Sequence, residues 1–267
     1  MVPSRTRGTV SVLAVIPARL GATRLPHKPL RLLGGVPLVV RVHQRVASLA
    51  VAARCVVATD ADEVLAACAR HGVPAVRTAA HHPSGTDRVA EVASHPDYSG
   101  ASVILNVQGD EPFVSAAALT GAVDVVRQGL APIGTAAAPL DPDRLAHPDV
   151  VKVTCTDDGR ALYFSRAPIP FLRDAADAAH RAALCWQHVG VYAYTPSALA
   201  RWVGWSPHPL ELVERLEQLR PLAHGLAIGV ARVAGSPAGI DTEDDLLEAN
   251  RRWPAFAAAH RLPGPVA

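Results

Sequence analysis

Strand patterns and amphipathic helix patterns alternate along the first half of the chain, and this alternation constrains the fold more than any other feature. Short apolar runs at 11–16, 54–59 and 102–107 have the composition of buried strands. Apolar residues at helical spacing occupy the intervening segments, as at 38–49 and 60–72. Strands joined by single helices favour an α/β fold with a mostly parallel sheet and helices on both faces.

The middle of the chain has a different pattern. Segments 150–155 and 161–166 predict a hairpin, because Asp158-Gly159 between them suits a tight turn. A further strand is predicted at 188–195, and its period of two places His188 and Tyr192 on one face. Segment 206–220 predicts one helix that begins at a Ser-Pro cap, with a core stripe of Leu212, Leu216 and Leu219.

Charge and cysteine usage exclude several classes of protein. The net charge is only +2 and the basic residues are dispersed, so a nucleic-acid surface is not expected. No stretch approaches the roughly 18 apolar residues of a membrane span. The four cysteines have no C-x-x-C spacing, which favours reduced thiols in a cytoplasmic protein.

Lysine is almost absent from the chain. Of 26 Lys and Arg residues, only Lys28 and Lys152 are lysines. Arginine therefore does not replace the compact ammonium charge at these two positions, which makes both of them candidates for a specific role.

The loop after the first strand, "VIPARLGATRLPHKPL" (15–30), combines three cations with glycine and proline. Arg19, Arg24 and Lys28 are spaced so that a curled loop can point all three inward. Arginine binds phosphate oxygens bidentately and lysine supplies a point charge, so the loop suits a polyphosphate. A solvated basic loop is the alternative. The loop has no Walker pattern.

Two acidic loops complete this picture. "NVQGDEP" (106–112) leaves Asp110 and Glu111 at the rim of a strand end, where Mg²⁺ would be held between carboxylate and phosphate. An ordinary acidic turn is the alternative. In "GIDTEDDLLEAN" (239–250), Asp241 would be a second Mg²⁺ ligand, although Asp241 or Thr242 capping the helix explains the acids equally well.

A fourth loop, "HHPSGTDR" (81–88), places small polar residues just before a helix. Ser84, Gly85 and Thr86 offer backbone amides and hydroxyls that can read a base or hold an anion. His81 and His82 lack a nearby third ligand and are interpreted as loop histidines.

Together these segments resemble the bacterial CMP-Kdo synthetases, the 3-deoxy-manno-octulosonate cytidylyltransferases. The shared motifs run in order from about residue 12 to 250: "IPARLGATRLPHKPL", "VVATD", "HPSGTDRVAEV", "ILNVQGDEP", "VVKV", "GRALYFSRAPIP", "HVGVYAY", "PLELVERLEQLR" and "GIDTEDDL". The resemblance implies a Rossmann-like nucleotide-diphospho-sugar transferase fold. It also implies a cytoplasmic, Mg²⁺-dependent homodimer that transfers CMP from CTP to a small acidic acceptor with release of pyrophosphate.

The resemblance further implies a division of labour within one domain covering 1–267. Segments 10–134 and 226–250 would bind the nucleotide, and 135–225 would bind the acceptor and form the dimer. The CTP-binding positions would be Ala18, Arg19, Arg24, Lys28, Ser84, Gly85 and Thr86. The catalytic positions would be Arg19, Lys28, Asp110 and Asp241, with Mg²⁺ on the two aspartates. The acceptor positions would be Gln108, Arg166, His188, Tyr192 and Glu217.

The chain departs from the family pattern at a few positions. His27 replaces the usual glycine, Pro83 replaces the usual glutamine, and 173–187 is Ala-rich and insertion-like. The acceptor expected first is Kdo. The alternatives are a phosphonate such as phosphonoformate, a CMP-sialic acid synthetase reaction, and a non-catalytic nucleotide-binding relative.

Overall fold

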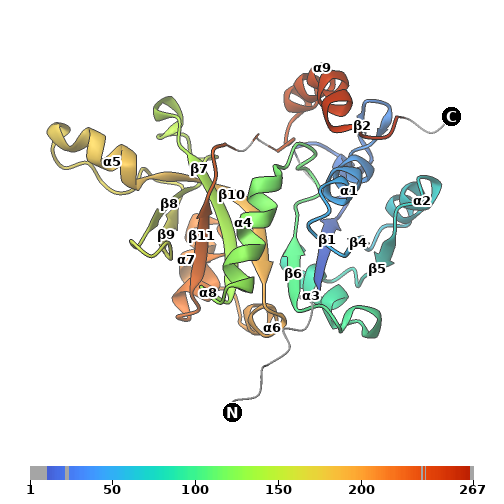
Figure 1. Cartoon of the computed structure of the whole chain (residues 1–267), viewed down its shortest axis with the longest axis horizontal. Coiled ribbons are helices and arrows are strands. Elements are labelled where there is room, and N and C mark those ends of the chain that lie inside the picture. The colour runs from blue at the N-terminus through green and yellow to red at the C-terminus, as the bar shows by residue number, and fades with distance from the viewer. Residues whose placement is uncertain (1–10, 22–23, 236, 238, 265–267) are drawn as a thin grey trace, which may run out of the picture.

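One mixed β-sheet organises the protein. The computed structural model describes residues 11–21, 24–235, 237 and 239–264. Within them the sheet has nine strands, seven of which lie in the order β11-β7-β10-β6-β1-β4-β5, and the β8–β9 hairpin attaches to β10 (Figure 1). Residues 1–10 and the positions 22 and 23 inside the predicted phosphate-binding loop lie outside this description.

The strands are β1 Val12–Ala18, β2 Leu32–Leu33, β3 Val36–Pro37, β4 Arg54–Thr59, β5 Ala75–Arg77, β6 Val103–Asn106, β7 Ile133–Pro139, β8 Lys152–Cys155, β9 Ala161–Ser165, β10 Trp186–Tyr194 and β11 Ile228–Arg232. The helices are α1 Leu38–Ser48, α2 Asp62–Arg70, α3 Gly85–Ser94, α4 Ala116–Arg127, α5 Ala178–Leu184, α6 Pro196–Gly204, α7 Pro209–Glu214, α8 Leu219–Ala223 and α9 Glu243–His260. Four short 3-10 turns cover Lys28–Leu30, Pro96–Tyr98, Pro142–Arg144 and Ala175–Asp177.

The strand directions confirm the mostly parallel sheet. β1 lies parallel to both β4 and β6, β4 to β5, and β11 to β7. β10 is the exception, since it runs antiparallel between β6 and β7. Because β10 comes from the predicted acceptor segment and β6 from the predicted nucleotide segment, both segments contribute to one sheet. The predicted 150–166 hairpin is confirmed as β8 and β9, with Gly159 at φ 81° in its turn.

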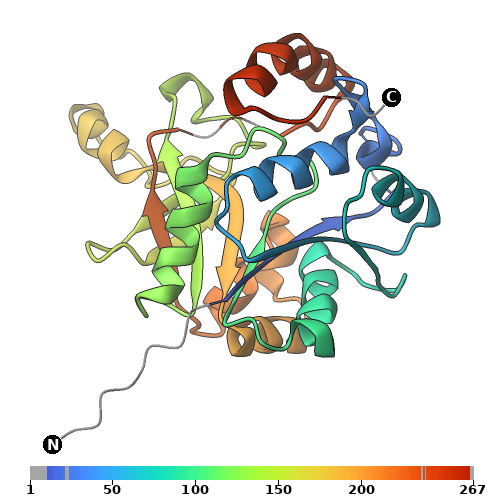
Figure 2. The same ribbon diagram turned by 45° about the vertical axis from the view of Figure 1, so that its right-hand side comes forward.

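Helices cover both faces of the sheet, as the sequence predicts. In β1, Ala14 and Ile16 face the layer of α1, α2, α4 and α9, whereas Leu13 and Val15 face the layer of α3, α6 and α8. All four side chains are fully buried, which is why the strand is an apolar run rather than an alternating one. Figure 2 shows the two helical layers on either side of the sheet.

The segment at 206–220 differs from the prediction of one helix. It forms two short helices, α7 and α8, and α7 is capped by His208 rather than at Ser206. Arg215 ends α7 in the left-handed region at φ 54°. Leu216 and Leu219 are buried as expected, but Leu212 is exposed. The leucine spacing continues across the break, so periodicity alone cannot locate it.

The insertion-like segment forms a separate feature. Its helix α5 stands away from the sheet at one end of the molecule (Figure 1). Every residue of α5 is partly or fully exposed, and Leu184 is among the exposed large apolar side chains. Within the described ranges, no helix is both long enough and apolar enough to cross a membrane.

Candidate active site

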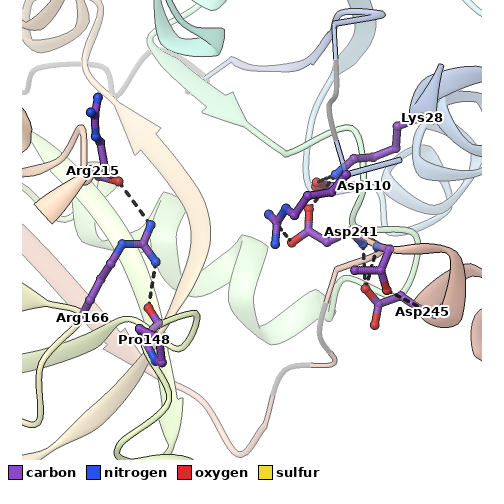
Figure 3. A network of polar contacts seen from close by, with 9 residues as sticks. Lys28, Asp110, Pro148, Arg166, Arg215, Asp241 and Asp245 are labelled. Atoms are coloured by element: carbon purple, nitrogen blue, oxygen red, sulfur yellow. Dashed lines mark hydrogen bonds and ion pairs between the residues drawn. The ribbon is translucent and has the colours of Figure 1, made fainter. Parts of the chain in front are cut away.

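Three loops meet at the carboxyl edge of the sheet and bring Lys28, Asp110 and Asp241 into contact. The Lys28 ammonium donates to Asp110 Oδ2 at 2.7 Å and to Asp241 Oδ1 at 2.8 Å. Arg24 lies 3.1 Å from the other oxygen of Asp241. Figure 3 shows the two aspartates on either side of the lysine. Lys28 and Asp241 are 213 positions apart in the chain, and the fold brings their side chains into contact.

Close backbone packing explains why these loops approach one another. A Cβ on Gly109 would lie 2.9 Å from the Pro17 carbonyl oxygen, so only glycine lets the 106–112 loop lie against the end of β1. The Ile240 amide donates to the Asp110 carbonyl at 3.0 Å, which fixes the third loop beside the second. Backbone contacts between the loops therefore set the positions of Asp110 and Asp241.

The cluster brings three carboxyl groups and two cations together in a small volume. Burial opposes the charge of Lys28, but the Asp110 and Asp241 carboxylates outweigh it and raise the pKa of the ammonium. Glu111 lies beside the same pair, and its burial together with their charges raises its pKa to about 8. A site of this kind favours a cation.

α9 is capped by Thr242, one of the two caps that the sequence left open. The Thr242 hydroxyl accepts from the Asp245 amide, and the Asp245 side chain accepts from the Thr242 amide. Asp245 also accepts from the Asp241 amide at 3.0 Å. The Asp241 carboxylate is therefore free of capping and points to Lys28 and Arg24 instead.

A cavity of about 290 Å³ opens beside this cluster, and four loops line it. It is bounded by Ala18, Arg19, Lys28, Ser84, Gly85, Gln108, Asp110 and Glu217, together with His82, Pro83 and Arg88. Most residues predicted to bind the nucleotide therefore share one cavity. Arg24 does not line it and instead faces the neighbouring one.

The Ser84–Thr86 turn is fixed at the start of α3. Ser84 Oγ accepts from the amides of Thr86 and Asp87 and so caps the helix. The Thr86 hydroxyl donates to Glu217 Oε2 at 2.8 Å. Burial raises the pKa of Glu217, although the hydrogen bonds from Thr86 and Ser84 oppose that rise. Behind this pair lies a smaller cavity of about 170 Å³, lined by Gln108, Tyr192 and Glu217 among others.

A third cavity, the largest of these three at about 440 Å³, lies on the other side of Asp241. Arg24, Glu111 and Asp241 form one wall, and Gln187 to Gly190 of β10 form another. The third wall comes from Arg144, His147, Asp149, Val150 and Val151, which sequence reasoning missed. These residues follow β7 in an irregular segment, and among them only Val150 and Val151 belong to a quoted motif, "VVKV".

The predicted acceptor residues are divided among these cavities. Gln108 and Glu217 line the first and second, Tyr192 the second, and His188 the third. Arg166 lines none of the three. Its guanidinium donates to the carbonyls of Glu214 at 2.8 Å, Pro148 at 2.8 Å and Arg215 at 3.3 Å, at a distance from the Lys28 cluster (Figure 3).

His188 and Tyr192 lie on one face of β10, as predicted, within an aromatic cluster. Their ring centroids are 5.4 Å apart, and His188 Nε2 lies 2.9 Å from the Thr135 hydroxyl. Burial lowers the pKa of His188 to about 3 and raises that of Tyr192 well above its usual value. Both side chains are therefore neutral near pH 7.

Two further residues at the site were missed by sequence reasoning. Arg88 is buried, lines the first cavity and forms an ion pair with Asp60 at 3.2 Å. Its place one turn after Ser84, in the same "SGTDR" motif, was the available signal. Glu111 was noted only as a rim acid, and its adjacency to Asp110 did not reveal that it would be half-buried in the wall of the 440 Å³ cavity.

The donor set fits a single Mg²⁺ ion held jointly with a phosphate. Across the residues that the structure describes, no group of three or more histidine, cysteine, aspartate or glutamate side chains is placed to hold a metal. Mg²⁺ usually takes only one or two carboxylates and completes its shell with water and phosphate oxygens. The Lys28 ammonium between Asp110 and Asp241 marks a position where a cation is already favourable.

A basic loop, a carboxylate pair and a polar cavity at the carboxyl edge of a mostly parallel sheet define a nucleotidyltransferase. The cytidylyltransferase family pattern matches residues 13–228. A 3-deoxy-manno-octulosonate cytidylyltransferase from Gemmatimonas aurantiaca is 70% identical over 93% of this chain and 96% of its own length. The chain belongs to the cytidylyltransferase family, in its 3-deoxy-manno-octulosonate cytidylyltransferase branch.

Other relatives and solved structures agree with this assignment. The enzyme of the same description from Herminiimonas arsenicoxydans is 44% identical over 91% of this chain and 98% of its own. A CMP:2-keto-3-deoxy-manno-octonic acid synthetase complexed with CTP superposes with a TM-score of 0.85 at 34% identity, covering 92% of this chain and 99% of that one. A 4-diphosphocytidyl-2C-methyl-D-erythritol synthase from Anaerococcus prevotii, 14% identical with a TM-score of 0.60 over 92% of this chain and 99% of that one, shares the fold.

Proposed function

We propose that the protein transfers CMP from CTP to 3-deoxy-manno-octulosonate (Kdo) and releases pyrophosphate. The observation that carries the proposal is the position of the Lys28–Asp110–Asp241 cluster, between the 290 Å³ cavity and the 440 Å³ cavity. A nucleotide in the first cavity and an acceptor in the second would meet at this cluster. The relatives of known description, at up to 70% identity, support Kdo over a phosphonate as the acceptor.

The first cavity is proposed to hold CTP. Ala18, Arg19 and Lys28 would face the triphosphate, and Arg24 would reach it from the neighbouring wall. Ser84, Gly85 and Thr86 would contact the cytosine side, with Glu217 holding Thr86 in place. Arginine and lysine would neutralise the charge on the phosphates and on the departing pyrophosphate.

Asp110 and Asp241 are the proposed ligands of Mg²⁺. When bound, the ion would neutralise phosphate charge and lower the pKa of the acceptor hydroxyl. The acceptor oxygen would form a bond to the α-phosphorus, the bond to pyrophosphate would break, and the hydroxyl proton would pass to solvent water. Lys28, released from the two carboxylates, would be free to contact the α-phosphate. The remaining contribution of the protein is to hold the reacting groups in line.

The 440 Å³ cavity is the proposed acceptor site. His188 lines it directly, and its neutral imidazole can exchange hydrogen bonds with hydroxyl groups. Gln108 follows β6 and lines the 290 Å³ and 170 Å³ cavities instead. Arg166, Tyr192 and Glu217, which the family pattern also assigns to the acceptor, would support this site from the adjoining segments.

A homodimer in the cytoplasm is proposed as the functional form. Large apolar side chains are exposed on the elements around α5, β9 and α7, which lie at one end of the molecule in Figure 1. They include Phe171 at 85% and Val213 at 83% exposure, together with Leu162, Leu184 and Leu212. Exposed apolar groups of this size favour contact with a second copy of the chain.

An acceptor panel tests the proposed reaction. Pyrophosphate release is measured with CTP and Mg²⁺ and, in parallel reactions, Kdo, sialic acid and phosphonoformate. Rapid release with Kdo alone is the expected result. Release with a phosphonate alone would replace Kdo as the acceptor, and absence of release with every acceptor would contradict the enzymatic proposal.

A further inference from the structure

We propose that Lys152 is a positioning residue that fixes one wall of the acceptor cavity. The inference rests on the proposed function, because it assigns the 440 Å³ cavity to the acceptor. Lys152 touches neither the Lys28 cluster nor any of the three cavities. Its role would be exerted through the segment 147–151 and through Arg166.

The environment of Lys152 is unusual for a lysine. The residue is fully buried on β8, with 0% of its surface exposed. Its ammonium donates to the carbonyls of His147 at 2.9 Å, Val150 at 2.7 Å and Arg166. No carboxylate forms an ion pair with it among the residues that the structure describes, although the nearby Glu214 carboxylate favours its charge and the Arg166 guanidinium opposes it. Three carbonyl oxygens therefore match the three donors of one ammonium group.

The cost of burying this charge points to a specific use. A buried charge without a counter-ion is unfavourable unless hydrogen bonds compensate it, and burial does lower the pKa of Lys152. A planar guanidinium presents its donors in a flat fork and cannot reproduce the three-way arrangement around one nitrogen. This explains why lysine persists here in a chain whose other cations are almost all arginine.

Two of the three carbonyls that Lys152 binds belong to residues in the wall of the acceptor cavity. His147 and Val150 line that cavity, and Asp149 lies between them. The Arg166 guanidinium donates to the Pro148 carbonyl at 2.8 Å, so Lys152 and Arg166 together hold three carbonyls of the same short segment. The His188 amide donates to the Val151 carbonyl at 2.8 Å, which connects this segment to the β10 wall.

The opposite wall of the cavity carries Asp241 and Arg24, which are fixed separately by the α9 cap and the Lys28 cluster. The width of the acceptor cavity therefore depends on where segment 147–151 lies. Loss of the ammonium would release three carbonyls and let this wall move. The nucleotide cavity contains no residue of that segment, so CTP binding would be spared.

Steady-state kinetics of Lys152→Met test the inference. We expect the KM for Kdo to rise at least tenfold while the KM for CTP stays within twofold of wild type. Lys152→Arg is expected to behave like Lys152→Met, because charge alone does not restore the geometry. Thr154→Ala is the matched control two residues along the same strand, and it should keep wild-type values for both substrates.

Several kinetic outcomes would overturn the inference. Unchanged kinetics in Lys152→Met, equal rises in both KM values, or full activity in Lys152→Arg would each do so. Turnover of Kdo by the wild type is measured first. An inactive wild type contradicts the proposed function, whereas an active wild type with an unaffected variant contradicts only the role of Lys152.

A second measurement does not require a Lys152 variant to fold. With only two lysines in the chain, ¹⁵N labelling at Nζ gives two side-chain ammonium signals, and Lys28→Met identifies which one belongs to Lys28. The Lys152 signal is expected to exchange slowly with water and to shift on addition of Kdo but not of CTP alone. A Lys152 signal that exchanges rapidly with water, or whose chemical shift does not change on addition of Kdo, would contradict the proposal.

Discussion

The Thr86 hydroxyl donates a 2.8 Å hydrogen bond to Glu217, which joins the start of α3 to the segment before α8. The two residues are 131 positions apart in the chain, and both border the cavities on the proposed cytosine side. This bond links the two parts of the chain that the sequence assigned to different ligands. Its loss should therefore affect nucleotide binding before it affects stability.

Thr86→Val tests that expectation. The variant keeps the shape of the side chain but removes the Thr86 donor from the half-buried Glu217 carboxyl, a change of about 1–1.5 kcal/mol. We expect the KM for CTP to rise about five- to tenfold. Ser94→Ala, at the other end of α3, is the control and should leave this value unaltered. Wild-type CTP kinetics in Thr86→Val would show that the Thr86–Glu217 hydrogen bond does not support CTP binding.

Lys28→Met tests whether the aspartate pair needs a cation. Without the ammonium, Arg24 alone offsets the charges of Asp110 and Asp241, and we expect the thermal midpoint in EDTA to fall by about 3–6 °C. Mg²⁺ should reverse most of this loss. Arg31→Met, which breaks an exposed ion pair with Glu243 at 2.5 Å, should show no such dependence on Mg²⁺. A loss that persists unchanged in Mg²⁺ would argue against a metal site at the two aspartates.

The departure from glycine at position 27 has a measurable consequence. His27 has φ 54°, in the left-handed region that costs a side-chain-bearing residue about 1–2 kcal/mol and glycine almost nothing. His27→Gly should be about 1 kcal/mol more stable than His27→Ala in urea unfolding, because both remove the imidazole and only one relieves the backbone. Equal stabilities would show that the turn does not hold this conformation in solution.

His188 predicts a pH dependence of stability. Its pKa is about 3 in the folded protein and about 6.5 in an unfolded chain. Its contribution is therefore complete above pH 6.5 and is lost as the pH falls, by up to about 1.4 kcal/mol per unit. Urea unfolding between pH 4.5 and 6 should give a steeper loss for wild type than for His188→Gln. The exposed-site control His95→Gln should keep the wild-type slope, and equal slopes in all three proteins would refute a buried neutral His188.

The parts of the fold that follow from local pattern are those that the sequence predicted. β1, β4 and β6 are continuous apolar runs because both faces of the sheet are covered, and Asp158-Gly159 identified the β8–β9 turn. The break at Arg215 could not be predicted, since Leu212, Leu216 and Leu219 continue the helical spacing across it. That break depends on distant contacts: the Glu214 and Arg215 carbonyls accept from Arg166.

The residues of the candidate site also fall into two groups, those that the sequence predicted and those that it did not. Lys28, Asp110 and Asp241 were singled out because each follows a strand end in an unusual loop, and the structure brings all three together. The His147 segment lies in irregular chain, and only its last two residues belong to a motif. Its place in a cavity wall depends on the buried Lys152 ammonium and on a hydrogen bond to β10; the scarcity of lysine drew attention to Lys152 but did not show which carbonyls it would bind.

The most direct test of the proposed reaction follows the phosphorus atoms themselves. Purified protein is mixed with CTP, Kdo and Mg²⁺, and the products are followed by ³¹P NMR beside an Asp110→Asn reaction. The account predicts that the wild type produces pyrophosphate and one new phosphodiester signal in equal amounts, with neither formed by Asp110→Asn. Pyrophosphate without the phosphodiester, or undiminished turnover in Asp110→Asn, would contradict it.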